Sequence, residues 1–231
     1  MKRSPIKKVI ILVSILAIPG FLFFYLLPHF AKNRYKSLPI FGEKVVATTF
    51  HTVKGKKIPD TIYHLVPDFK LVNQHSDTVS WKSFENKIVV LNLFHAGAKK
   101  QQASKYIKQL SDGYEQKPLV KFVSLSVDPA DTGLIKNFAA NFKAKEGKWD
   151  FLAGDTAQTY PLIRQGLLLD VIANESDGKN SFIFSNKIVL IDNLHRIRGI
   201  YDADSAEANA KLEDEIKVLI AEYLRNVKDG R

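Results

Sequence analysis

The first long run of apolar residues lies close to the amino terminus. Val9–Pro28 contains 20 residues and no charged side chain. At about 1.5 Å per residue, a helix of this length crosses the hydrocarbon core of a bilayer, which is about 30 Å thick. Tyr25 suits an interfacial position, and bilayer helices tolerate a Pro19-Gly20 pair better than soluble helices do. The pattern predicts a transmembrane helix over residues 9–28.

Charged residues on both sides of this stretch bear on its orientation. Four cationic residues lie in positions 1–8 and three more in positions 29–36. The positive-inside rule favours a cytoplasmic segment over residues 1–8 and an extracytoplasmic, periplasmic location for the rest. A cleaved signal peptide is the alternative, but the stretch is long for one and no small-x-small cleavage site follows it. We expect an uncleaved, single-pass signal anchor.

Residues 29–61 have a weaker pattern and read as a tether with some β structure. Prolines and glycines at intervals along this segment favour turns, and Val45–Val53 has the character of a short strand. The regular alternation of a globular domain begins near Ile62, so we expect one domain over residues 62–231.

Two continuous apolar runs in this domain, Ile88–Phe94 and Leu119–Val127, have the character of buried strands. Lys99–Tyr114, between them, has apolar residues at helical spacing. The other expected elements are a hairpin of Phe69–Val72 and Thr78–Trp81, a helix that follows Asp128–Thr132 and ends near Phe142, a short strand in Gly147–Gly154, a helix over Thr156–Leu169, strands over Ser181–Phe184, Ile188–Asp192 and Arg196–Tyr201, and an amphipathic helix over Ser205–Val227.

The order of these elements predicts the fold class. A β-hairpin, a βαβ unit, a helix, a second hairpin and a final helix describe an α/β protein with a thioredoxin-like fold. In that fold, helices flank both faces of a central mixed sheet. Pro161 fits best in the first turn of its helix.

Composition narrows the chemistry. The 231 residues include no cysteine, which excludes disulfides, thiolate metal sites and thiol catalysis. The formal net charge of +10 is spread out and lacks a nucleic-acid motif, so we expect no nucleic acid partner. Asp128, Asp131 and Asp155 are interpreted as turn and helix-cap residues. No catalytic motif is visible, and we expect no enzyme activity.

Five short motifs resemble the Sco/SenC family of membrane-anchored, thioredoxin-like copper proteins that assist cytochrome c oxidase assembly. The resemblance covers about residues 62–225. In chain order the motifs are Tyr63-His64-x-Val66-Pro67-Asp68-Phe69, Val123-Ser-x-Ser126-Val127-Asp128-Pro129 with Asp131-Thr132, Trp149-x-Phe151-Leu152-x-Gly154, Lys187 to Asp192, and Arg196-Ile-Arg198-Gly199-x-Tyr201-Asp202.

This resemblance implies a copper site that the residues here do not supply. The family binds copper with a C-x-x-x-C pair after the first buried strand and a distant histidine, because soft thiolates and an imidazole suit copper. Those positions fall on Ala98, Gln102 and Phe184. We therefore expect no copper cofactor. His95 is a rescue candidate, although one histidine does not make a metal site.

Two functions remain open from the sequence. The first is a non-catalytic accessory factor in respiratory or envelope biogenesis, anchored in a membrane and acting on respiratory-complex subunits or assembly factors. The alternative is a copper chaperone with a rebuilt site that includes His95. A thiol peroxidase or disulfide reductase is excluded, since both need a nucleophilic thiolate.

Overall fold

The computed structural model describes residues 5–26, 37–53, 55–98, 100–174 and 181–228. The chain divides into two compact units, residues 1–36 and residues 37–231. Every residue of the two hydrophobic cores belongs to the second unit. Residues 37–231 therefore contain all the packing that holds the globular fold and are expected to fold without the first unit.

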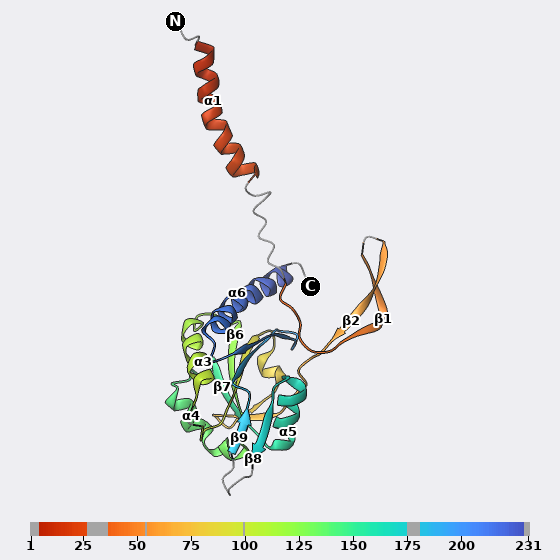
Figure 1. The fold of residues 1–231 in the computed structure, drawn as a ribbon, viewed down its shortest axis with the longest axis vertical. Coiled ribbons are helices and arrows are strands. Elements are labelled where there is room, and N and C mark those ends of the chain that lie inside the picture. The colour runs from red at the N-terminus through yellow and green to blue at the C-terminus, as the bar shows by residue number, and fades with distance from the viewer. Residues whose placement is uncertain (1–4, 27–36, 54, 99, 175–180, 229–231) are drawn as a thin grey trace. The chain divides into compact units, whose positions relative to one another are not determined.

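The first unit contains one helix. α1 (Pro5–Phe21) continues into a π-helical segment, Leu22–Leu26 (Figure 1). Ile6–Tyr25 has a mean hydropathy of 2.2 and, by length and composition, is a candidate membrane span. A signal sequence would satisfy the same criteria, so the uncleaved anchor stays a prediction. Pro28, the last residue of the expected span, lies outside the described residues.

A seven-stranded mixed sheet forms the centre of the second unit, in the order β11-β10-β5-β6-β7-β3-β4. The three middle strands β5, β6 and β7 are parallel, and the other pairings are antiparallel. The strands are β3 (Leu71–Asn73), β4 (Thr78–Val79), β5 (Ile88–Phe94), β6 (Val120–Ser126), β7 (Trp149–Ala153), β10 (Lys187–Ile191) and β11 (Ile197–Asp202).

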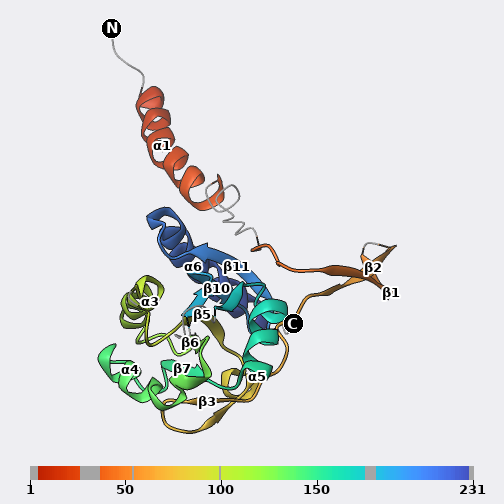
Figure 2. The same ribbon diagram turned by 60° about the horizontal axis from the view of Figure 1, so that its bottom comes forward.

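Helices cover both faces of this sheet (Figure 2). One core lies under α3 (Gln102–Gly113), α4 (Ile135–Asn141) and α6 (Ala206–Lys228). The other lies under the 3-10 helix η2 (Trp81–Phe84), α5 (Thr156–Pro161) and the π-helical η4 (Leu162–Gly166). Alternate residues of β5 enter opposite cores: Val90 faces the first and Leu91 the second. The expected thioredoxin-like fold is confirmed.

Buried polar side chains lock the parallel strands together. Ser124 Oγ donates to Asn92 Oδ1 at 2.6 Å and accepts from Trp149 Nε1 at 3.0 Å. Asn92 Nδ2 donates to Ser104 Oγ on α3 at 3.1 Å. This network joins β5, β6, β7 and α3 below the end of the sheet where the candidate site lies. It fixes the three strands and α3 relative to one another.

A buried arginine joins the terminal hairpin to α6. Arg198, on β11, is 2% exposed, and its guanidinium lies 3.0 Å from Asp192 Oδ2 and 3.0 Å from Glu222 Oε2. It also donates to the carbonyl oxygens of Leu38 and Pro39. The sheet edge, the last helix and the start of the unit are thus held by one side chain.

Two hairpins lie outside the main sheet. β1 (Lys44–Val53) pairs with β2 (Lys56–Tyr63), and β8 (Val171–Asn174) pairs with β9 (Ser181–Phe184). A backbone hydrogen bond from His64 to Glu43 closes the base of the first hairpin, and one from Phe41 to Ile197 ties the chain just before it to β11. The strand expected over Val45–Val53 is β1.

The structure differs from the sequence predictions at several element ends. The helix expected from Lys99 begins at Gln102, and Lys99 lies outside the described residues. Pro161 is the last residue of α5 and does not lie in its first turn, and the π-helical η4 follows it directly. β8 was not expected, and it makes Ser181–Phe184 part of a separate hairpin.

Candidate functional site

The candidate site lies where the parallel strands β5 and β6 end. In their register Phe94 is opposite Ser126, so the residues that follow each strand meet at one edge of the sheet. His95 follows β5. Asp128 and Asp131 follow β6, in and beside the 3-10 helix η3 (Pro129–Gly133). Ligand sites of α/β proteins commonly occupy this carboxyl edge.

His95 contacts both aspartates. Its Nδ1 lies 3.3 Å from Asp131 Oδ2 and 3.7 Å from Asp128 Oδ2. The side chains of His95, Asp128 and Asp131 are 18%, 10% and 2% exposed, so the cluster is largely shielded from water. One imidazole nitrogen and one oxygen from each carboxylate lie within 4.8 Å of one another.

The aspartates have other hydrogen-bond donors as well. Asp131 Oδ2 accepts from Ser126 Oγ at 2.6 Å and from the Ala96 amide at 2.9 Å. Asp128 Oδ1 accepts from the Ala130 amide at 2.9 Å and caps η3, as expected from the sequence. Asp131 thus connects the end of β5 to the end of β6, and its contact with His95 is part of that connection.

The turn after β5 is held by a neighbouring glutamine. Gln101 Nε2 donates to the carbonyl oxygens of His95 at 2.7 Å and Ala98 at 3.1 Å. The Ala98 amide donates to the His95 carbonyl oxygen at 3.0 Å. A methyl group added at Gly97 would lie 2.7 Å from His95 Nε2, so glycine gives the imidazole its room there. The described part of this turn is closed by its own hydrogen bonds.

Strand β9 brings aromatic side chains toward the same place. The Phe182 ring lies 5.1 Å from the His95 ring, measured between centroids, at an interplanar angle of 57°. Phe182 and Phe184 are both half-buried against the core that α5 covers. The β8–β9 register pairs Ala173 with Phe182 and Val171 with Phe184, so both rings face inward.

The three positions that the family resemblance assigned to copper ligands carry no donor of that kind. Ala98 is half-buried in the turn, Gln102 is exposed at the first position of α3, and Phe184 ends β9. Phe182, and not Phe184, is the residue whose ring contacts His95. The structure therefore brings His95 close to β9 but provides neither thiolate nor imidazole at the inferred ligand positions.

The cluster around His95 fits copper poorly. Cu(I) prefers soft thiolate and thioether ligands, whereas this cluster offers one imidazole and two carboxylates. Asp131 Oδ2 already accepts two hydrogen bonds, from Ser126 and Ala96. A metal at that oxygen would replace contacts that hold two strand ends together. We derive no copper chemistry from these residues.

One nearby polar group is unusual. Among the described residues, the buried Tyr160 hydroxyl has no hydrogen-bond partner. Burial raises the pKa of Tyr160, and the negative charge of Asp128 adds to that rise while Arg164 opposes it. Tyr160 therefore stays a neutral phenol on the α5 side of the cluster.

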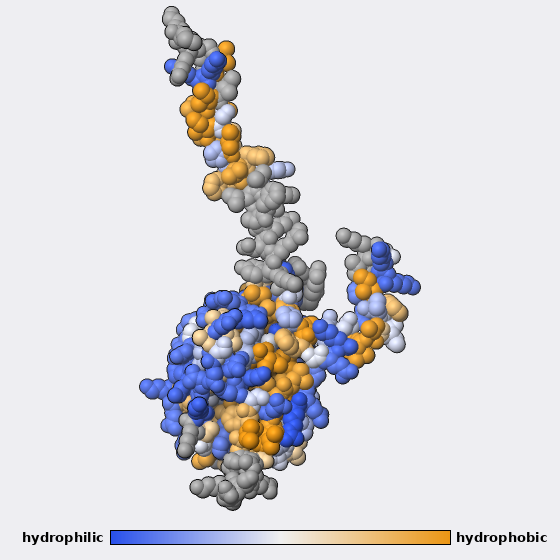
Figure 3. Space-filling model, in the orientation of Figure 1, coloured by the Kyte–Doolittle hydropathy of each residue, from blue (hydrophilic) through white to orange (hydrophobic). Residues whose placement is uncertain are grey.

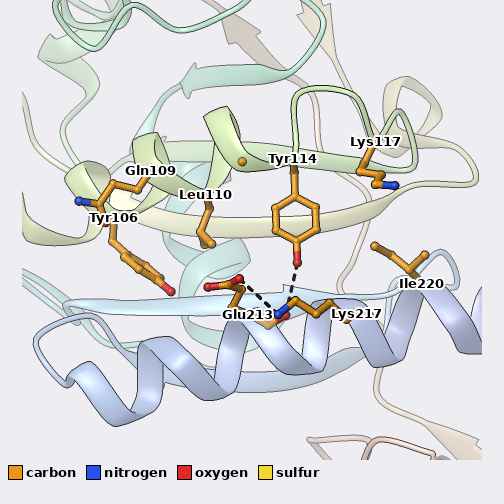
Figure 4. Close-up of a pocket in the computed structure, with 9 residues that line it drawn as sticks. Tyr106, Gln109, Leu110, Tyr114, Lys117, Glu213, Lys217 and Ile220 are labelled. Carbon is orange, nitrogen blue, oxygen red and sulfur yellow. Dashed lines mark hydrogen bonds and ion pairs between the residues drawn. The ribbon is translucent and has the colours of Figure 1, made fainter.

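A separate hollow of about 620 Å³ lies between α3 and α6 (Figure 4). Its two tyrosine hydroxyls are already engaged: Tyr106 donates to the Asn209 carbonyl oxygen and Tyr114 to that of Glu213. Lys217 crosses its rim to Glu213 at 3.3 Å. None of the site residues expected from the sequence lines it. These contacts join the two helices.

The sequence identified His95 but not its partners. The sequence marks Asp131 only as a turn or helix-cap residue and Ser126 only as part of a family motif, and it does not single out Gln101 or Phe182. The signal that would have found Asp131 is topological. Two buried runs joined by a helix predict adjacent parallel strands, and residues just past their carboxyl ends must then lie close together.

Comparison with protein families gives a match over most of the globular unit. The model of the family described as SCO1/SenC matches residues 59–221. No curated protein matches the chain.

Solved structures show the same fold at low sequence identity. A SCO1/SenC family lipoprotein from Bacillus anthracis str. Ames has a TM-score of 0.60 and 21% identity, covering 68% of this chain and 95% of that chain. Bradyrhizobium japonicum ScoI with copper bound has a TM-score of 0.54 and 20% identity, covering 65% and 98%. BsSco, described as a member of the Sco family of cytochrome c oxidase assembly proteins, has a TM-score of 0.55 and 19% identity, covering 67% and 93%.

Proposed function

The chain belongs to the SCO1/SenC family, and from this premise we propose that it is a membrane-anchored accessory factor that assists the assembly of a respiratory oxidase through protein contact. It acts without bound copper and without enzymatic turnover. Its partners are oxidase subunits or other assembly factors.

One observation carries this proposal: the ligand positions have lost donor chemistry while the frame around them is intact. Ala98 lies in the turn between β5 and α3, Gln102 begins α3, and Phe184 ends β9. The buried Asn92–Ser124–Trp149 network and the His95–Asp131 contact hold the ends of β5 and β6 in place beside them. A frame that is maintained at this edge without its metal ligands is suited to presenting a surface.

An exposed apolar pair next to this edge supplies a contact surface. Ile172 on β8 is 54% exposed and Ile183 on β9 is 61% exposed, and the two are directly opposite in the register. Ile183 follows Phe182, the residue whose ring lies on His95. Because successive side chains of a strand point to opposite faces, Phe182 closes the edge while Ile183 faces outward.

The respiratory role rests on the family. BsSco is described as belonging to the Sco family of cytochrome c oxidase assembly proteins, and the Bradyrhizobium structure contains copper. We extend the assembly role to this chain and leave copper delivery out, since the residues here do not supply the ligands.

Anchoring by α1 is the second part of the proposal. Ile6–Tyr25 has the length and hydropathy of a span, and the cationic residues 2–8 favour a cytoplasmic amino terminus. The globular unit then lies on the periplasmic side. Alkaline carbonate extraction of membranes that contain the full chain tests the anchor. Protease added to intact spheroplasts tests the side, and protection of the globular unit would contradict it.

Affinity purification tests the contact role. The full chain, solubilised from membranes in a mild detergent, is expected to recover oxidase subunits or assembly factors. The double variant Ile172→Ser/Ile183→Ser is expected to recover several-fold less. Leu134→Ser/Leu224→Ser, which changes two similarly exposed apolar residues elsewhere, is the matched control. Recovery of no specific partner, or equal recovery with both variants, would count against the proposal.

A second candidate function follows from the metal-like grouping of His95, Asp128 and Asp131. An imidazole and two carboxylates suit a divalent ion such as Zn²⁺ better than Cu(I). Isothermal titration of residues 37–231 with Zn²⁺ and with Cu²⁺ separates the two candidates. Binding tighter than about 1 µM that is lost in His95→Ala would favour the metal protein over the contact factor.

A further inference from the structure

The hairpin of residues 44–63, which we call the β1–β2 arm, is exposed on both faces. Its two strands pair only with each other, whereas the main sheet consists of β3 to β7, β10 and β11. Val45, Val46, Phe50, Ile58 and Ile62 are between 42% and 68% exposed. An isolated two-stranded hairpin is at best marginally stable in water. Exposed apolar residues on such a hairpin indicate that another surface covers it.

The strand register sorts the side chains of the arm onto two faces. Val46 is opposite Thr61 and Phe50 is opposite Pro59, so these four share one face. The same register places Lys44 at the base of that face and Lys57 near its tip. Val46, Phe50 and Pro59 give this face an apolar band with a lysine at each end, while Val45, Ile58 and Ile62 lie on the other face. Figure 3 shows hydrophobic and hydrophilic residues side by side along the arm.

Acidic charge is confined to the other face. Asp60 is the one acidic residue in positions 44–63, where the sequence has four lysines. Asp60 Oδ1 lies 2.6 Å from His51 Nδ1, and this pair occupies the face opposite Phe50. The face with Lys44, Val46, Phe50 and Lys57 therefore combines apolar area with two lysines, and no acidic residue of positions 44–63 lies on it.

The arm is close in sequence to the candidate membrane span. Only residues 27–43 separate the end of that helical segment from β1. A connection of this length extends at most about 60 Å. A helix that crosses a bilayer therefore keeps the arm within reach of the same bilayer.

We propose that this face of the β1–β2 arm lies on the surface of a bilayer containing anionic phospholipid. Val46 and Phe50 enter the headgroup region, and Lys44 and Lys57 contact lipid phosphates. Combined apolar and cationic side chains are the general basis of interfacial membrane binding. The inference rests on the proposed membrane anchoring and extends it, since it gives the globular unit a preferred orientation.

A second copy of the chain is a less suitable occupant. Lysines along an edge strand oppose edge-to-edge pairing, because like charges are brought together. Lys44 and Lys57 would face their own counterparts or each other in such a pair. An anionic lipid surface neutralises them instead.

Vesicle sedimentation of residues 37–231 tests the proposal without the helix. The unit is expected to bind vesicles of phosphatidylcholine with about 30% phosphatidylglycerol, and to bind pure phosphatidylcholine vesicles much more weakly, with the difference lost at high salt. Each lysine near an anionic surface contributes about fivefold to the partition coefficient. Lys44→Glu/Lys57→Glu is therefore expected to lower binding at least about 25-fold, and Val46→Ser/Phe50→Ser about tenfold.

Lys105→Glu/Lys136→Glu changes the net charge equally through exposed lysines outside the arm, and it should retain nearly all binding. Three results would overturn the proposal: no binding to anionic vesicles, equal binding by the arm variants, or self-association without lipid that depends on Val46 and Phe50. Carbonate extraction of the full chain reports separately on the helix, so failure of the arm and failure of the anchor are distinguishable.

Discussion

His95 Nδ1 lies 3.3 Å from Asp131 Oδ2, and this contact joins the carboxyl ends of the two central parallel strands. The same carboxylate oxygen accepts hydrogen bonds from Ser126 and from the backbone of Ala96. The pair therefore belongs to a structural connection at the edge of the sheet where the family resemblance located copper.

The two residues differ in the hydrogen bonds that they make, which predicts unequal effects of substitution. Asp131→Ala removes the acceptor for a buried hydroxyl and a backbone amide and is expected to cost about 3 kcal/mol of unfolding free energy. His95→Ala removes one long hydrogen bond, to Asp131, and weaker contacts with Asp128 and Phe182, and it is expected to cost about 1 kcal/mol. Urea unfolding of residues 37–231 measures both. Equal losses would show that Asp131 has no connecting role beyond its histidine.

Gln101 and Gln102 are neighbours with different predicted effects. Gln101 donates to two carbonyl oxygens in the turn after β5, whereas Gln102 is exposed. Gln101→Ala is expected to speed hydrogen exchange of the Ala98 amide about fivefold, because a net hydrogen bond is worth about 1 kcal/mol. Gln102→Ala is the control and should leave that rate unchanged. Equal rates in both variants would contradict the role given to Gln101.

Arg198 is expected to dominate the stability of the terminal hairpin. Arg198→Met removes the ion pair between Arg198 and Glu222, and it leaves the buried Asp192 with one arginine fewer. Breaking such a pair costs about 3 kcal/mol or more. Arg196→Ala, which removes the more exposed partner of Asp192, is expected to cost about 1 kcal/mol. Thermal unfolding of the two variants tests the order, and a larger loss for Arg196→Ala would contradict it.

Because the pKa of Lys148 is lowered, we expect the free energy of unfolding to increase at mildly alkaline pH. Burial, aided by the positive charges of Lys121 and Lys87, lowers the pKa of Lys148 from 10.5 to about 8. Between these values the unfolded chain holds more protons than the folded one, so the free energy of unfolding rises with pH. Below pH 8 this contribution is constant.

Urea unfolding at several pH values between about 7 and 9.5 measures this dependence. The range stays below the pH at which the tyrosines with raised pKa begin to oppose it. Lys148→Met is expected to remove the rise, and Lys105→Met, at an exposed position, to retain it. If the free energy of unfolding still rises with pH in Lys148→Met, another titrating group causes the rise, and the prediction is wrong.

The fold was predictable because its strongest signals are local. The buried runs Ile88–Phe94 and Leu119–Val127 became β5 and β6, and the amphipathic pattern after Ser205 became α6. β8 was not predicted because Val171–Asn174 has no alternation of apolar and polar residues that marks it as a strand. The β1–β2 arm was expected only as a tether with one strand. Its apolar residues are exposed, and their spacing is not that of a buried strand.

The candidate site was predictable only in part. The resemblance placed Ala98, Gln102 and Phe184 from sequence spacing along two separate motifs. The contact of His95 with Asp131 depends on the parallel register of β5 and β6, and that of His95 with Phe182 depends on where the β8–β9 hairpin packs. Neither contact follows from residues close together in the sequence, so both could be found only in the tertiary structure.

Copper titration of residues 37–231 against a competing chelator tests the central claim most directly. The unchanged sequence is expected to show no saturable Cu(I) or Cu(II) site tighter than about 1 µM. The triple variant Ala98→Cys/Gln102→Cys/Phe184→His, which places the family's ligand types at the inferred positions, serves as a reference for the restored set. Tight, stoichiometric copper binding by the unchanged chain, lost in His95→Ala, would contradict the claim that this member of the family works without its metal.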